Sequence, residues 1–448
     1  MRSRHKAFRI FAVVVGFSLA LLWDQGRGLF AMPPVHRMVL QNRLVLLVIE
    51  EHALPVVTLQ LLVNSGSWKD PPGEEGLAYL TAQGILHGTS GHTAEELSRK
   101  LDFIGTSLDI DCDKDYATFG LQVLEKDLDA GFDLFMDAVT DSVFPEDEFV
   151  REKEKTLGAI RSAEDQPSDV AGKVFEKALF LTSPYAHPVE GTKESAGGLG
   201  RDAVLRFYGT NYRPNLSVLA VVGDISLDEV KSKLVPRLEK WQAAEAPEVP
   251  FIPSFAAGPE TIGIDRPITQ ANIILGHEGV ERQNKDYYAL SVMNFILGGG
   301  DFTSRLLEEI RVKRGLVYFV GSVFVPRKHP GSFQVALGTK NESAGEAVSL
   351  VRQEMERIRT EPVSERELEV ARKYLVGSFP LRFQTQKGLA AFFCQVEFLG
   401  LGLDYPEKYP SLIDSVTRED VLRVARTYLH PDKAILVVVG NLKEVKLE

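Results

Sequence analysis

The chain has 448 residues, of which 44% are hydrophobic and 25% are charged, with 37 Gly and 23 Pro. This composition is typical of globular proteins, excludes disordered and fibrous classes, and at this length predicts two or three domains. Lys and Arg total 51 against 62 Asp and Glu, so the net charge of −11 argues against a nucleic-acid partner held by general electrostatics. Two cysteines exclude a disulfide framework and a cysteine-rich zinc site, and whether Cys112 pairs with Cys394 stays open.

The first 31 residues have the layout of a secretory signal peptide. Basic residues precede an apolar run at residues 10–23, and the small residues Gly26, Gly28 and Ala31 follow. The run has 14 residues, fewer than the roughly 18–20 that span a bilayer. An uncleaved anchor is the alternative, because Leu29 places a large side chain at the −3 position of a cleavage after Ala31. Either outcome predicts an exported protein, periplasmic or secreted, with inner-membrane anchoring if the segment stays uncleaved.

Strands and helices alternate irregularly in the first half. Leu44–Glu50 and Val56–Val63 are predicted as a hairpin-related pair of apolar strands. Thr93 and Glu96 predict a capping box that opens a helix ending near Phe103. Two further elements are predicted downstream: a strand over 117–123 and a helix over 145–163.

Four aspartates alternate with other residues around the strand predicted at 108–112. Asp109, Asp111, Asp113 and Asp115 suggest calcium, but no EF-hand glycine or distal glutamate follows them. Strict alternation is better explained by the solvent face of a half-exposed strand.

The two halves of the chain repeat each other. Residues 204–224 align without gaps on residues 421–441, with a constant offset of 217 and nine identical pairs in 21 positions. Each copy predicts a helix, a turn containing proline, and an apolar strand that ends at glycine and is buried on both faces.

A proline-rich segment separates the halves. Pro247, Pro250, Pro253 and Pro259 lie among many alanines and predict an extended linker over 243–258. The domain boundaries are therefore placed at 36–242 and 259–448.

The second half continues the pattern, with strands expected at 273–275, 317–324 and 333–337 and helices at 287–297, 344–359 and 365–379. Neighbouring strands with grouped helices predict an α+β fold rather than a doubly wound parallel sheet.

Residues 64–89 and residues 293–322 carry a resemblance to a known family, the M16 (insulinase/pitrilysin, mitochondrial processing peptidase) family. Residues 64–89, NSGSWKDPPGEEGLAYLTAQGILHGT, resemble the family's active-site helix region. Residues 293–322, MNFILGGGDFTSRLLEEIRVKRGLVYFVGS, resemble a substrate-binding segment of its second domain. The resemblance covers nearly all of the mature chain and implies two homologous LuxS/MPP-like α/β-roll domains in tandem after the signal peptide.

Active members of the family carry an inverted zinc motif, His-x-x-Glu-His, and a distal glutamate as third ligand. Two His four residues apart share one helix face and bind zinc, and the Glu between them is the general base. The matching positions here hold Tyr79, Ala82, Gln83 and, 76 residues after Gln83, Ala159. The resemblance therefore implies that this chain holds no zinc and has no catalytic residues of its own.

No substitute metal or phosphate site is predicted. His87 and His92 are five residues apart with glycines between them, so a shared helix face is not assured. Gly298-Gly299-Gly300 lacks the Lys-Ser/Thr of a phosphate-binding loop and is better explained by a turn before the helix near Thr303.

Arg314 and Tyr318 match the family's Arg/Tyr pair, which holds the substrate backbone beside the zinc of an opposing domain or subunit. Guanidinium and phenol groups donate to peptide carbonyls, which makes the role plausible, and a purely structural Arg and strand Tyr are the alternative. In two-component members one subunit keeps the zinc motif and the other keeps this pair.

The resemblance implies a subunit that is not an enzyme by itself. It would position a peptide or small unfolded protein through Arg314 and Tyr318 for a catalytic M16 partner with an intact zinc motif, which would supply the zinc. One alternative is a scaffold or chaperone-like peptide-binding protein with no role in proteolysis. Another is a hydrolase with an unrecognised site.

Overall fold

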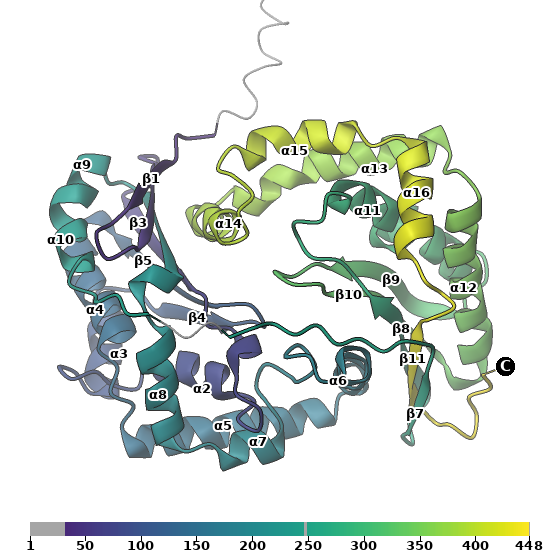
Figure 1. Ribbon diagram of the computed structural model, residues 1–448, viewed down its shortest axis with the longest axis horizontal. Coiled ribbons are helices and arrows are strands. Elements are labelled where there is room, and N and C mark those ends of the chain that lie inside the picture. The colour runs from purple at the N-terminus through teal and green to yellow at the C-terminus, as the bar shows by residue number, and fades with distance from the viewer. Residues whose placement is uncertain (1–31, 246–248, 448) are drawn as a thin grey trace, which may run out of the picture. The chain divides into compact units, whose positions relative to one another are not determined.

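The computed structural model describes residues 32–245 and 249–447, which form two mixed β-sheets with associated helices (Figure 1). The strands are β1 (His36–Val39), β2 (Val45–Glu50), β3 (Val56–Val63), β4 (Leu108–Cys112), β5 (Ala117–Leu124), β6 (Ser217–Gly223), β7 (Thr261–Asp265), β8 (Gln270–Glu278), β9 (Val317–Val325), β10 (Ser332–Lys340) and β11 (Ile435–Gly440). The helices are α2 (Leu77–Gly84), α3 (Ala94–Phe103), α4 (Leu128–Thr140), α5 (Glu146–Glu164), α6 (Pro167–Phe180), α7 (Lys193–Gly198), α8 (Arg201–Asn211), α9 (Leu227–Glu229), α10 (Val235–Leu238), α11 (Tyr287–Asn294), α12 (Ala344–Thr360), α13 (Glu365–Ser378), α14 (Gln386–Phe398), α15 (Tyr405–Asp414) and α16 (Arg418–Tyr428).

The predicted signal peptide, residues 1–31, lies outside the described residues, and so do residues 246–248 of the predicted linker. Within the described ranges, no helix combines the length and the apolar character that crossing a bilayer requires.

The two sheets have the same topology. The N-terminal sheet has the strand order β1-β2-β6-β3-β5-β4, and the C-terminal sheet has the order β7-β11-β8-β10-β9. In each sheet the last strand in sequence pairs in parallel with one neighbour and antiparallel with the other. Apart from the extra edge strand β1, the sheets correspond strand for strand. The predicted mixture of helices and sheet in two similar halves is confirmed.

The internal repeat occupies equivalent places in the two halves. Helix α8 at 201–211 and α16 at 418–428 differ by the predicted offset of 217 residues. The strands that follow them, β6 and β11, are fully buried along their length and lie at matching positions in the sheets. The predicted helix, turn and doubly buried strand are confirmed in both copies.

The predicted pairing of the first two apolar strands is wrong. Strands β2 and β3 are not neighbours, because β6 lies between them, parallel to β2 and antiparallel to β3. Both strands are largely buried, and no local pattern marks a strand that enters between them from some 160 residues later in the chain.

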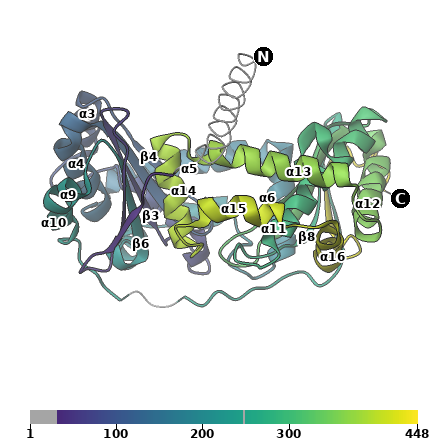
Figure 2. The same cartoon turned by 90° about the horizontal axis from the view of Figure 1, so that it is seen from above.

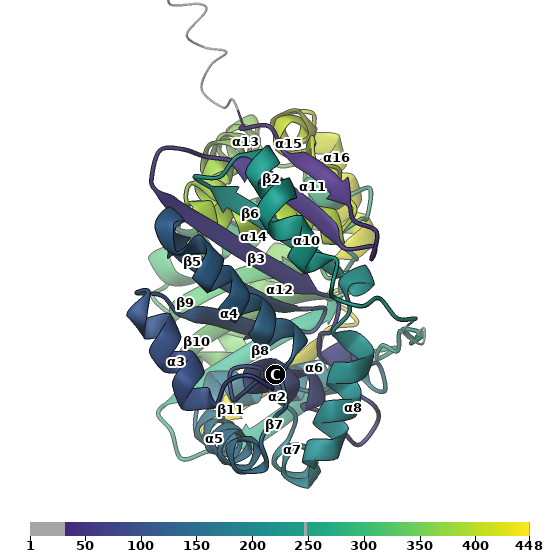
Figure 3. The same ribbon diagram turned by 90° about the vertical axis from the view of Figure 1, so that its left-hand side faces the viewer.

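Most predicted helices are found with small changes of length. The capping box at Thr93 and Glu96 is present, with each side chain bonded to the backbone of the other. The helix expected at 287–297 continues beyond α11 as a π-helical turn, Phe295–Gly299. Figure 3 shows α3 and α4 in front of the N-terminal sheet, and the buried side chains of α4, including Phe132 and Phe135, join its apolar core.

The two halves exchange a helix. Helix α6 of the N-terminal half packs on β8 and β11 of the C-terminal sheet, and α14 of the C-terminal half packs on β3 and β6 of the N-terminal sheet (Figures 1 and 2). Phe175 of α6 is fully buried, and its ring lies so close to Gly276 that a Cβ there would be 2.6 Å from it. Residues 36–448 consequently form one compact unit.

The solvent-face interpretation is confirmed for Asp109 and Asp111, which are exposed on β4, and is wrong for Asp115, which follows the strand and is buried. Three of the four aspartates also contact the C-terminal half. Asp109 pairs with Lys387 of α14 at 2.7 Å, and Asp113 pairs with Arg327 at 3.0 Å. Asp115 is 4% exposed and accepts the backbone N–H of residue 328 at 2.9 Å. The aspartates alternate along the chain as predicted, but the cationic partners of Asp109 and Asp113 come from distant parts of the sequence.

The question of a disulfide is settled: Cys112 and Cys394 are both buried and unpaired. Cys394 lies on the exchanged helix α14, where its thiol is 3.2 Å from the carbonyl oxygen of Gln60 in β3.

Because α6 packs on the opposite sheet, a core substitution in α6 should destabilise strands of the C-terminal half. Phe175→Ala should lower the free energy of unfolding by about 3–5 kcal/mol, since a fully buried ring leaves a cavity. The faster amide hydrogen exchange should appear in β8 and β11 of the other half. The exposed Lys177→Ala on the same helix is the matched control, with a change below about 0.5 kcal/mol. Loss of protection confined to β2–β6 would contradict the exchange.

Buried His277 predicts an acid-sensitive step in stability. Its Nδ1–H donates to the carbonyl of Glu278 and its Nε2 accepts the backbone N–H of His430, and burial lowers its pKa to about 4. This folded-state pKa lies below the ordinary 6.5. The stabilisation of the fold by neutral His277 is therefore complete above pH 6.5 and is lost as the pH falls toward 4. At ~1.4 kcal/mol per pH unit the loss is about 3 kcal/mol. Urea titrations between pH 7 and 4 should show this loss of unfolding free energy in the native chain and not in His277→Gln.

Candidate functional site

The start of α2 is fixed by a buried carboxylate. Asp70 accepts the backbone N–H groups of Gly76 at 2.8 Å and Ala78 at 2.7 Å, and burial raises its pKa well above the ordinary value. Gly76 has φ +98, and a Cβ there would be 2.5 Å from the carbonyl oxygen of Glu190. The helix that carries Tyr79, Ala82 and Gln83 is thus fixed at its N-terminus.

The four degenerate positions lie on α2 and α5, which pack against each other. Tyr79 and Gln83 are half-buried and four residues apart, so they share one face of α2, while Ala82 is fully buried in the N-terminal core. Ala159 is exposed on α5. Burial, and after it the carboxylate of Glu152, raises the pKa of the Tyr79 phenol.

The two histidines near this site point to different partners. His87 Nε2 lies 3.1 Å from a carboxylate oxygen of Glu152 on α5, and His92 Nδ1 lies 3.6 Å from Asp137 on α4. Among residues 32–245 and 249–447, no group of three or more His, Cys, Asp or Glu side chains is placed to hold a metal ion. The residues at the degenerate site therefore do not fit the zinc that the motif binds in active relatives.

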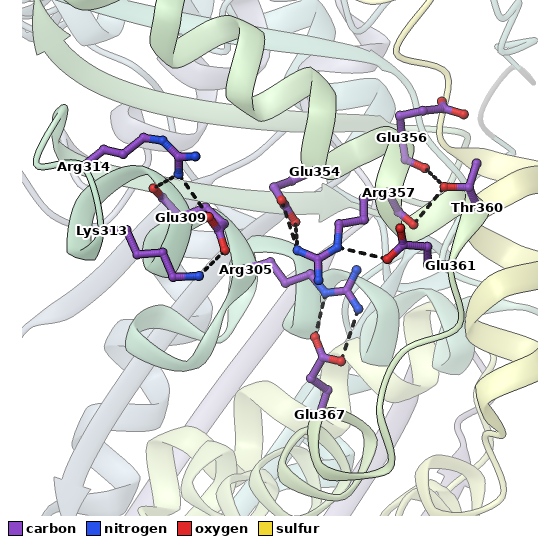
Figure 4. A network of polar contacts seen from close by, with 10 residues as sticks. All are labelled: Arg305, Glu309, Lys313, Arg314, Glu354, Glu356, Arg357, Thr360, Glu361 and Glu367. Atoms are coloured by element: carbon purple, nitrogen blue, oxygen red, sulfur yellow. Dashed lines mark hydrogen bonds and ion pairs between the residues drawn. The ribbon is translucent and has the colours of Figure 1, made fainter.

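Arg314 is positioned by a π-helical turn, Leu307–Val312. A π-helical turn brings residues five apart together, and Arg314 Nη1 donates to both the carbonyl oxygen of Glu309 at 2.8 Å and its carboxylate at 3.0 Å (Figure 4). Gly315, with φ +65, then ends the turn and directs the chain into β9. The Arg314 side chain is 40% exposed.

Tyr318 is turned outward by a β-bulge at the edge of the C-terminal sheet. Val317 pairs with Thr339 and Phe319 pairs with Gly338, so Tyr318 is an extra residue without a partner on β10. A bulge re-aims side chains and is frequent beside functional sites. It explains why Tyr318 and Phe319 are both exposed, at 57% and 47%, although neighbours in a regular strand face opposite sides. In the described part of the chain, the Tyr318 hydroxyl has no hydrogen-bond partner.

The glycine run before this segment has a packing role. A Cβ at Gly298 would lie 2.6 Å from the backbone nitrogen of Ser322 in β9, and one at Gly300 would lie 2.7 Å from the carbonyl oxygen of Phe295. Glycine is required because the turn lies directly against the strand that carries Tyr318. The turn interpretation holds only for Gly300, which precedes the short helix Asp301–Thr303, because Gly298 and Gly299 belong to the π-helical turn that continues α11.

The structure places Tyr318 at the start of the edge strand β9 and Arg314 in the turn that precedes this strand, both on the C-terminal half. Tyr79, Ala82, Gln83 and Ala159 lie on the N-terminal half. Within the described residues no hydrogen bond or ion pair joins the two sets. They are separate features of the chain.

Two family profiles match the chain. The profile for the insulinase family, peptidase family M16, matches residues 45–193, and the profile for the peptidase M16 inactive domain matches residues 198–375. The fold and the two matches together place the chain in a single class: it belongs to the M16 family.

Relatives from several bacteria span most of this chain. An uncharacterized zinc protease of Streptomyces coelicolor is 28% identical over 86% of this chain and 85% of its own length. The non-peptidase homolog YmxG of Helicobacter pylori is 25% identical over 96% of this chain and 99% of its own. A crystal structure of a peptidase M16 inactive domain from Pseudomonas fluorescens, 26% identical, superposes with a TM-score of 0.86 over 92% of this chain and 99% of that one.

Some of these relatives are named as proteases and one is named as a non-peptidase homolog. The type of this chain therefore has to be judged from its own residues at the motif positions. Tyr79, Ala82 and Gln83 replace the motif that a zinc protease needs. The chain is an M16 protein of the inactive type.

One residue of the Arg314 site was missed from the sequence. That residue is Glu309. An α-helix would pair Glu309 with Lys313 four residues on, and this pair is present. The contact of Glu309 with Arg314, five residues on, depends on the π-helical turn. The run of charges in Glu308-Glu309-Ile310-Arg311-Val312-Lys313-Arg314 is also typical of a solvated helix face, which hides the contact.

The degenerate site predicts the metal content. The purified chain should contain no stoichiometric zinc and cleave no peptide, since Tyr79, Gln83 and Ala159 remove all three ligands. Elemental analysis after mild chelation is the measurement. The triple variant Tyr79→His, Gln83→His, Ala159→Glu is the positive control and should take up about one zinc per chain. One zinc retained by the native chain would contradict the assignment.

Proposed function

We propose that this chain is the non-catalytic, substrate-positioning subunit of an exported heteromeric M16-type zinc metallopeptidase. The zinc and its ligands belong to a partner subunit with an intact His-x-x-Glu-His motif. The substrate is a peptide or a small unfolded protein. The family membership and the degenerate ligand positions support a non-catalytic role.

The observation that carries the proposal is the outward placement of Tyr318 by the bulge, four residues after an Arg314 with free donors. Arg314 has five N–H groups, and two on Nη1 are used by Glu309, which leaves three. A purely structural pair would be satisfied within the chain, whereas these groups are available to peptide carbonyls.

The proposed contribution to catalysis is electrostatic and geometric. Arg314 donates charge-assisted hydrogen bonds to a backbone carbonyl of the bound peptide, and Tyr318 donates a neutral one. Together they hold the peptide in a fixed register and favour the charge that develops on the carbonyl during attack in the partner's site. This chain neither activates water nor transfers a proton.

The finer features of the chain are part of the same proposal. The halves are LuxS/MPP-like α/β-roll domains with boundaries at 36–242 and 259–448, joined by the linker 243–258. Residues 1–31 are a signal peptide or an uncleaved anchor, which makes the protein periplasmic or secreted, or anchored in the inner membrane.

The alternative is a scaffold or chaperone-like peptide-binding protein with no role in proteolysis. The exposed apolar side chains on β9, Phe319 and Val323, would suit a peptide in either case. The two functions differ in one respect: a scaffold supports assembly or peptide binding without any effect of Arg314 on cleavage.

The proposal predicts the activity of a reconstituted complex. The chain is co-expressed with an M16 protein of the same organism that carries the intact motif, and cleavage of an internally quenched peptide is measured. Arg314→Ala should lower kcat/KM by about ten- to a hundred-fold, because bonds to a charged donor contribute roughly 1.5–3 kcal/mol. Tyr318→Phe should cost less, since only a neutral donor is lost.

The matched control is Arg311→Ala, which removes a guanidinium from the same π-helical turn where it lies over the Phe302 ring. It should change kcat/KM by less than about two-fold. Gel filtration should show intact complexes for all three variants. Full activity of the Arg314→Ala, Tyr318→Phe double variant would leave this chain a scaffold.

A further inference from the structure

The Arg314 guanidinium has a fixed anchor within its own turn. Arginine side chains carry about 2 kcal/mol of rotamer entropy, so an arginine that grips a substrate is more effective when it is held in advance. Here Nη1 is held at two points by one residue, through the carbonyl and the carboxylate of Glu309 (Figure 4). The anchored edge is Nη1, and the Nε–H and Nη2 edge stays free.

Glu309 is itself held in place. Its side chain is 18% exposed, and the carboxylate accepts a bond from Lys313 Nζ as well as from Arg314. Lys313, followed by Arg314, holds the pKa of Glu309 below its usual range against the effect of burial. The carboxylate is therefore ionised at neutral pH and engaged on both sides.

The second cation keeps the site positive. A lone Glu–Arg pair would cancel the charge that Arg314 offers to a carbonyl. Lys313, Glu309 and Arg314 together carry a net charge of +1, so the anchor orients the guanidinium without neutralising the local field.

We infer that Glu309 is a positioning residue, which holds Arg314 so that its free N–H edge meets the backbone of the bound peptide. This inference rests on the proposed function, because it concerns how Arg314 acts on the substrate of the complex. Glu309 does not touch the peptide and acts only through Arg314.

A double-mutant cycle in the reconstituted complex tests this, with kcat and KM measured separately on the same quenched peptide. Glu309→Gln removes the charge of the anchor and keeps its backbone carbonyl, so kcat/KM should fall about three- to ten-fold. In the Arg314→Ala background, Glu309→Gln should change kcat/KM by less than two-fold, because there is nothing left to position. The fall should appear mainly in kcat, since a misplaced guanidinium still binds peptide in some orientations.

The matched control is Glu308→Gln, the same charge change one residue away, at a side chain that lines a cavity with Phe295 and Phe302. It should leave kcat/KM within two-fold of the native value, and thermal unfolding of each variant checks the fold. If Arg314→Ala lowers activity and Glu309→Gln has no effect, or has the same effect in both backgrounds, the positioning role is overturned. A rise in kcat/KM for Glu309→Gln also overturns it, because the carboxylate would then withhold the guanidinium. If Arg314→Ala itself has no effect, it is the proposed function that fails.

Discussion

The packing of α6 and α14 on the sheet of the opposite half is the constraint on which the rest of the structure depends. The apolar faces of β8 and β11 are covered by Phe175, Leu179 and Phe180 of α6. Each such fully buried side chain contributes about 1.5–3 kcal/mol relative to exposure, in a protein whose net stability is of the order of 5–15 kcal/mol. Neither sheet has a complete apolar cover without the other half. The ion pairs of Asp109 and Asp113 with Lys387 and Arg327 add specificity to this packing rather than its main energy.

Protein groups hold the region of α2 in place. Helix α2 begins on the buried carboxylate of Asp70, and the segment after α2 is joined to α5 by the contact between His87 and Glu152. The fold around the degenerate positions is therefore supported by hydrogen bonds and an ion pair between residues of the chain itself.

The sequence predicts the duplication, most helices and the buried strands, because each rests on a local pattern such as the Thr93 capping box or the apolar strands that end at Gly223 and Gly440. It fails for strand neighbours, since β6 enters between β2 and β3 from far along the chain. It fails again for Asp113 and Asp115, whose partners are some 210 residues away.

For the candidate site, the sequence finds Arg314 and Tyr318 by resemblance, but not the reasons for their placement. The π-helical turn behind Arg314 and the extra residue in β9 at Tyr318 leave no mark in composition or periodicity. The π-helical turn bonds residues five apart instead of four, and the bulge inserts one unpaired residue into β9. Glu309 is found only once that departure is known.

The exchanged helices also impose an order on folding during synthesis. Helix α6 is complete at residue 180, yet the strand β11 that it covers ends at residue 440, almost the last residue of the chain. Until β11 is made, β8 is the one strand of that pair on which α6 can pack, and such long-range contacts are slow to form and exposed to aggregation. The N-terminal half is therefore complete only once β11 has been made, and a truncation that removes β11 would uncover part of the apolar face of α6 as well.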